Sequence, residues 1–139
     1  MILKLIIGKN FIYHLVIIIA IFFNSCTELY TDKTLVGSWE GDLKDYKVRL
    51  IFERNLNCRI ELITNQGENF RYNGIYETNF FKKPITLSIK NINKIRNPLH
   101  TIISFINKDS LKMSIFSRKW RLRPINFYDG NTVFLKRAD

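Results

Sequence analysis

Few side chains in this sequence have the chemistry of a catalytic or metal-binding group. Beyond residue 26 the sequence holds one cysteine and one histidine, Cys58 and His100. A neighbouring Cys–His pair can form a nucleophile, whereas a metal site needs several such ligands. Cys58 alternates with Ile60 and Leu62 on an apolar face, which is typical of a core cysteine. His100 stands where a loop meets a strand, which favours a surface position, so we expect no catalytic residue, no metal and no cofactor.

Carboxylates are the second candidate, because two of them can act together as general acid and base. Three glutamates fall on polar strand faces together with three arginines: Glu53, Glu61 and Glu77 with Arg49, Arg59 and Arg71. Opposite charges on neighbouring strands form cross-strand ion pairs. We therefore expect an ion-paired outer surface here and a chain that is not an enzyme.

The strongest charged feature is a basic stretch with an aromatic residue inside it, made of Arg118, Lys119, Trp120, Arg121 and Arg123. Such a group can bind an anionic partner through charge and cation–π contacts. The alternative is the solvated face of a last hairpin with Trp120 as its anchor, since charge runs often do no more than solvate a surface. The sequence does not decide between these two interpretations.

The first 26 residues differ from the rest of the chain. Lys4 and Lys9 are their only charged residues, and residues 11–23 are almost wholly apolar. A basic start followed by a short apolar run is typical of an export signal, whereas a permanent transmembrane helix needs about 20 apolar residues. We therefore expect a signal peptide over residues 1–25.

The end of this segment, Phe23-Asn24-Ser25-Cys26, resembles the lipobox of bacterial lipoproteins. The resemblance implies that Cys26 becomes the N-terminus, carries acyl chains such as palmitate, and is followed by a tether over 26–33. It also implies a place in the bacterial envelope, at the outer membrane, with the membrane as partner and no nucleic acid. The alternative is an uncleaved signal anchor in which Cys26 is incidental. With Cys26 acylated, Cys58 has no thiol left for an intramolecular disulfide.

Residues 34–139 have the pattern of short β-strands. Alanine, the best helix former, occurs only at 20 and 138, and β-branched and aromatic residues dominate. Apolar and polar residues alternate over eight ranges: 35–40, 46–53, 58–64, 70–78, 85–91, 101–106, 111–116 and 132–137. Gly41-Asp42 is expected to form a turn or bulge. We predict an all-β domain, an eight-stranded antiparallel up-and-down barrel that leaves no open sheet edge.

The start of the first strand, Gly37-Ser38-Trp39, resembles the Gly-x-Trp opening of lipocalin-like barrels. The resemblance implies that Trp39 plugs the closed end of the barrel and that a basic residue of the last strand packs over it. Arg137 is the best match for that partner, and Arg123 is the second.

Two functions follow from this domain. In the first, a monomeric barrel binds a small apolar or amphipathic ligand in a lumen lined by aromatic residues: Phe52, Phe70, Tyr72, Tyr76 and Phe105. In the second, the lumen is filled and the basic stretch docks a protein or an anionic envelope polymer. A barrel of eight strands has room either for its own side chains or for one small ligand, so the sequence leaves both open.

Overall fold

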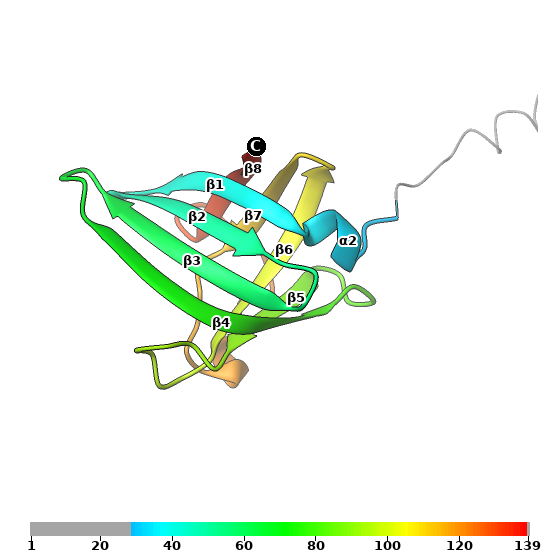
Figure 1. Ribbon diagram of the computed structural model, residues 1–139. Helices are drawn as coiled ribbons and strands as arrows, with labels where there is room; N and C mark the ends of the chain where they lie inside the picture. The colour runs from blue at the N-terminus through cyan, green and yellow to red at the C-terminus, as the bar shows by residue number, and fades with distance from the viewer. Residues whose placement is uncertain (1–28, 139) are drawn as a thin grey trace, which may run out of the picture.

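The computed structural model describes residues 29–138, and it forms one closed antiparallel barrel in which each strand pairs with the next and the last pairs with the first (Figure 1). The expected signal peptide and Cys26 lie outside the described residues. The strands are β1 (Gly37–Leu43), β2 (Tyr46–Phe52), β3 (Asn57–Thr64), β4 (Asn69–Asn79), β5 (Ile85–Lys90), β6 (Leu99–Asn107), β7 (Ser110–Ser114) and β8 (Thr132–Ala138). The prediction of an all-β, eight-stranded barrel is confirmed.

The expected turn at Gly41-Asp42 is wrong, because β1 continues to Leu43 and the chain turns just after it. Gly41 pairs with Val48 inside the β1–β2 ladder. A Cβ atom at Gly41 would lie 2.3 Å from the carbonyl oxygen of Phe134 in β8. The glycine therefore permits a close approach of two strands where the barrel closes, which is another common reason for glycine within a strand.

Apolar side chains on alternate strand positions fill the half of the barrel where β1 begins. Trp39, Leu50, Phe52 and Tyr76 are almost completely buried there. The Phe52 and Tyr76 rings meet edge to face with centroids 5.0 Å apart. Because large side chains occupy this half, it is a packed core.

A short helix, α2 (Asp32–Leu35), covers this closed end of the barrel (Figure 1). Leu35 is fully buried, and its carbonyl oxygen accepts a 2.8 Å hydrogen bond from the Trp39 indole N–H. The Thr78 hydroxyl donates to the Asp32 carboxylate, which ties α2 to β4. The helix begins at Asp32, so the last two residues of the range 26–33 expected as a tether are helical. The buried Leu35, two residues after Lys33, gives this helical turn an apolar anchor.

Arg137 closes the same end from β8. Its guanidinium lies 4.3 Å from the centroid of the Trp39 ring, the packing that the lipocalin-like resemblance implied. It also donates to the carbonyl oxygens of Thr34 (2.7 Å), Val36 (2.9 Å) and Lys108 (3.0 Å). Gly37 has a φ of +132°, and a Cβ there would lie 2.5 Å from Arg137 Nη1. Glycine at 37 therefore makes room for the arginine.

The loop after β7, the β7–β8 segment (residues 115–131), is the longest of the barrel. It contains the 3₁₀ helix η1 (Trp120–Leu122). Ser117 pairs with His100 of β6 through two backbone hydrogen bonds of 2.8 Å, and Arg123 donates to the outward-facing Ser88 of β5, so the segment lies over the outer face of β5–β6. The basic stretch therefore belongs to the long connection between the paired strands β7 and β8, which passes over β5–β6 before it returns into β8.

Candidate functional site

The open end of the barrel contains an apolar cavity of about 160 Å³. Its walls come from every strand except β5, from the β5–β6 loop and from the start of the β7–β8 segment: Leu43, Val48, Ile60, Leu62, Tyr72, Ile95, Leu99, Met113, Ile115, Phe116 and Val133. An apolar cavity of about 150 Å³ is large enough to bind benzene. The lumen is thus filled at one end and can take a small apolar molecule at the other.

Of the five aromatic residues expected to line a ligand site, Tyr72 lines this cavity. Phe52 and Tyr76 belong to the packed half, where the Tyr76 hydroxyl donates a 2.9 Å hydrogen bond to the Glu53 carbonyl oxygen. Phe105 packs at the closed end and stacks on Tyr30 with ring centroids 4.6 Å apart. Phe70 is 44% exposed at the start of β4. The five residues therefore do not form one site.

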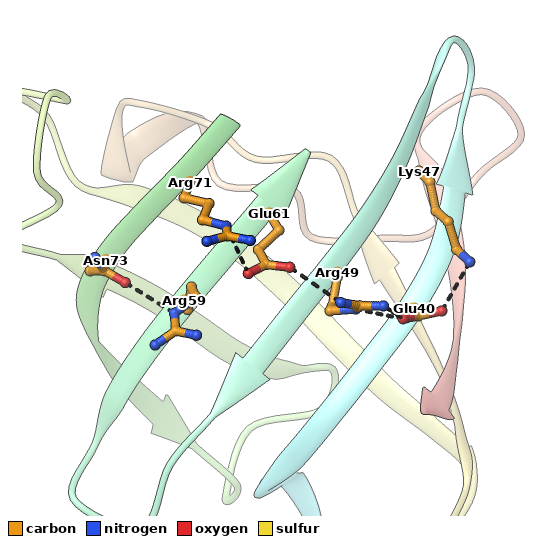
Figure 2. A network of polar contacts seen from close by, with 7 residues as sticks. All are labelled: Glu40, Lys47, Arg49, Arg59, Glu61, Arg71 and Asn73. Carbon is orange, nitrogen blue, oxygen red and sulfur yellow. Dashed lines mark hydrogen bonds and ion pairs between the residues drawn. The ribbon is translucent and has the colours of Figure 1, made fainter. Parts of the chain in front are cut away.

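Ion pairs run across the outer face of β1–β4 (Figure 2). Glu40 binds Lys47 at 3.1 Å and also Arg49, which reaches Glu61 at 3.4 Å. Arg71 approaches the second oxygen of Glu61 at 3.4 Å. Hydrogen bonds from Lys47 and Arg49 hold the pKa of Glu40 below its ordinary value. Each carboxylate is neutralised by basic groups, so this face has the chemistry of a structural network.

The expected ion pairs are confirmed for Glu61 with Arg49 and Arg71. Glu77 instead pairs with Lys90 of β5, and hydrogen bonding to that lysine lowers the pKa of Glu77. Arg59 reaches the Asn73 side chain at 3.4 Å. Glu53 forms no ion pair with any residue in the range 29–138.

Cys58 and His100 point to opposite sides of the barrel wall. Cys58 belongs to the buried core cluster, and burial raises the pKa of its thiol to about 12. The thiol is therefore protonated at neutral pH and is a poor nucleophile. His100 faces outward, beneath the β7–β8 segment. The structure thus brings no Cys–His pair together.

The expected surface position of His100 is wrong, because the β7–β8 segment covers it and leaves it 6% exposed. Its Nδ1 lies 2.9 Å from Ser88 Oγ and 3.1 Å from Arg123 Nη2. The arginine can only donate, so Nδ1 accepts and the proton of the neutral ring is on Nε2. Burial, together with the charge of Arg123, lowers the pKa of His100. The imidazole is therefore neutral at neutral pH.

A second hollow, the outer cleft, lies between the β7–β8 segment, the β4–β5 loop and the outer face of β5–β6. Its volume is about 410 Å³. Four basic residues line it, Lys82, Lys83, Arg121 and Arg123, together with apolar surface that includes Trp120. Of the predicted basic stretch, Arg118 and Lys119 are exposed outside the cleft. Lys82 and Lys83 are distant from this stretch in the sequence and adjoin it only in the folded chain, so no local pattern singles them out.

Neither metal chemistry nor a membrane-spanning helix is indicated by residues 29–138. Within that range no three histidine, cysteine or carboxylate side chains gather in a way that could hold a metal ion. No helix in the same range has the length and apolarity to cross a membrane. No protein-family model matches the chain, and comparisons with curated proteins and with solved structures gave no match.

Proposed function

We propose that this protein is a lipid-anchored binding module of the bacterial envelope that holds a small apolar ligand at the open end of its barrel. The observation that carries the proposal is the apolar cavity of about 160 Å³. Ligand sites in proteins are concave and mainly apolar, and barrel mouths are a common place for them. The module is a monomer and performs no chemistry on its ligand.

In this proposal the lipid anchor is attached near the closed end of the barrel, opposite the end that contains the cavity. Leu29 lies beside the β4–β5 loop, where it lines a hollow with Phe80 and Phe81. An acyl group on Cys26 is three residues away from Leu29, which is about 10 Å of extended chain. This geometry favours an orientation with the closed end at the outer membrane and the open end directed away from it. An uncleaved signal anchor would give the same orientation.

We expect Cys26→Ser to abolish lipid attachment. The replacement removes the one thiol that the lipobox pattern offers for acylation, and a stable anchor needs more than one acyl chain. Cells grown with an acyl-chain probe should label the wild-type protein and leave Cys26→Ser unlabelled. Cys58→Ser is the matched control and should label fully. Equal labelling of the wild type and Cys26→Ser would show that Cys26 is not the attachment site.

We expect toluene to enter the cavity and to change the NMR signal of the Met113 methyl group. Met113 lines the cavity and is the only methionine after Met1, so methyl labelling of a chain that begins at residue 27 gives one reporter there. Ile115→Trp places a larger side chain at the cavity mouth and should remove the response. The measurement is a titration of the labelled protein with toluene.

Ile106→Trp is the control for this titration. Ile106 is about half exposed, close to the exposure of Ile115, but it lies on β6 near the closed end. This variant should respond to toluene as the wild type does. A wild-type Met113 signal that stays constant up to toluene saturation would overturn the proposed lumen ligand.

A further inference from the structure

The outer cleft combines positive charge with apolar surface. Lys82 and Lys83 approach from the β4–β5 loop, while Arg121 and Arg123 approach from the β7–β8 segment. None of the four forms an ion pair with any residue in the range 29–138. Of the residues that the structure describes, no acidic one lines the cleft. Four cations around one hollow attract an anion, and low-dielectric walls strengthen that attraction.

Arg123 is held in place by two neutral side chains, while the nearby Glu77 carboxylate, which is paired with Lys90, compensates its charge only in part. Its Nη2 donates to Ser88 Oγ and to His100 Nδ1, and both partners are neutral. Its Nε is buried and has no hydrogen-bond partner in the described part of the chain. A buried donor without a partner costs free energy, so the fold keeps this guanidinium here against a penalty. Holding a charged group ready for an anion is a physical reason for such an arrangement.

The rest of the cleft suits an alkyl chain. Ile102 of β6 and Pro84 of the β4–β5 loop line one side of the cleft. Trp120 and Ile125 of the β7–β8 segment line the other side. Trp120 is 66% exposed and Ile125 is 76% exposed. An apolar patch beside charged residues is typical of a binding surface, and a volume of about 410 Å³ is within the range of small-molecule sites.

We propose that the outer cleft binds an anionic amphiphile, that is, a phosphate or carboxylate group on a short alkyl chain. The basic residues bind the head group, and the apolar side chains bind the chain. This site is separate from the lumen and lies on the outside of the barrel. A free amphiphile and the head group of a membrane lipid share this chemistry, and both are covered by the test.

Trp120 provides the signal for the test, since the other tryptophan, Trp39, is fully buried. The protein for this test is a chain that begins at residue 27. Decyl phosphate, added below its micellar concentration, should shift the tryptophan emission to shorter wavelength and leave the circular dichroism spectrum unchanged. Decanol, which lacks the charge, and inorganic phosphate, which lacks the chain, should each bind at least about tenfold more weakly. Equal affinity for either one would overturn the proposal.

Two double variants with the same change of net charge locate the site. Lys83→Ser/Arg121→Ser should weaken decyl phosphate binding about tenfold or more, because the loss of even one charge-assisted contact weakens binding by about that factor. Arg118→Ser/Lys119→Ser, outside the cleft, should stay within about twofold of wild type. Equal losses in both variants would overturn the proposal and assign binding to the general basic charge.

Vesicles containing an anionic phospholipid distinguish the two possible ligands, a free amphiphile and the head group of a membrane lipid. Displacement of decyl phosphate by the vesicles identifies a lipid head group as the ligand, and lack of displacement identifies a free amphiphile. Binding of the vesicles without any response to decyl phosphate would overturn the proposal in favour of a membrane-facing surface. Lys83→Ser/Arg121→Ser should keep the toluene response of Met113, so the cleft and the lumen are tested independently.

Discussion

Replacement of Trp39 by alanine is expected to lower the free energy of unfolding by about 3–5 kcal/mol. The Trp39 side chain is fully buried at the closed end, where its indole N–H donates to the Leu35 carbonyl oxygen. Its ring packs against Phe105 and lies beneath Arg137. Alanine would leave a cavity that the closed barrel cannot collapse to fill. A loss of this size is a large share of the stability of a small domain.

Urea denaturation followed by circular dichroism measures this loss. Trp120→Ala is the matched control, because it removes the same side chain from a position that is 66% exposed on η1. The control should change the free energy of unfolding by less than about 0.5 kcal/mol. Similar values for the two variants would contradict the role of Trp39 as the plug of the closed end.

The strands could be predicted because the barrel wall has two environments that alternate along each strand. Val48, Leu50 and Phe52 point into the core, and the residues between them point outward. This alternation is a local property of the sequence. Gly41 shows where local reasoning fails. A glycine is compatible with a turn or with a close strand contact, and the carbonyl of Phe134 that requires it is far away in the chain.

The candidate sites were harder to predict, because each depends on how loops are placed. His100 looks like a surface residue in its own strand, and it is buried only because the β7–β8 segment crosses it. Lys83 and Arg121 share a cleft although 37 residues separate them in the numbering. The cavity likewise depends on Ile95 in a loop. No short-range pattern in the sequence reports contacts of this kind.

Arg137→Met is expected to lower the free energy of unfolding by about 2–4 kcal/mol, because it leaves three carbonyl oxygens without their charged donor. Those oxygens belong to Thr34, Val36 and Lys108, so one side chain joins β8 to both α2 and the β6–β7 turn. Methionine keeps much of the side-chain volume over Trp39 but donates nothing. Lys136→Met, on the exposed face of the same strand, is the matched control and should change stability little.

Gly37→Ala adds a second test of the same contact. In the wild type the new Cβ would meet Arg137 Nη1 at 2.5 Å, and the φ of +132° is unfavourable for alanine. With methionine at 137 the guanidinium is gone, and only the backbone penalty remains. The loss caused by Gly37→Ala should therefore be smaller in Arg137→Met than in the wild type, as urea denaturation of the double-mutant cycle measures. Additive losses would mean that Gly37 is required by the backbone alone and not by the approach of Arg137.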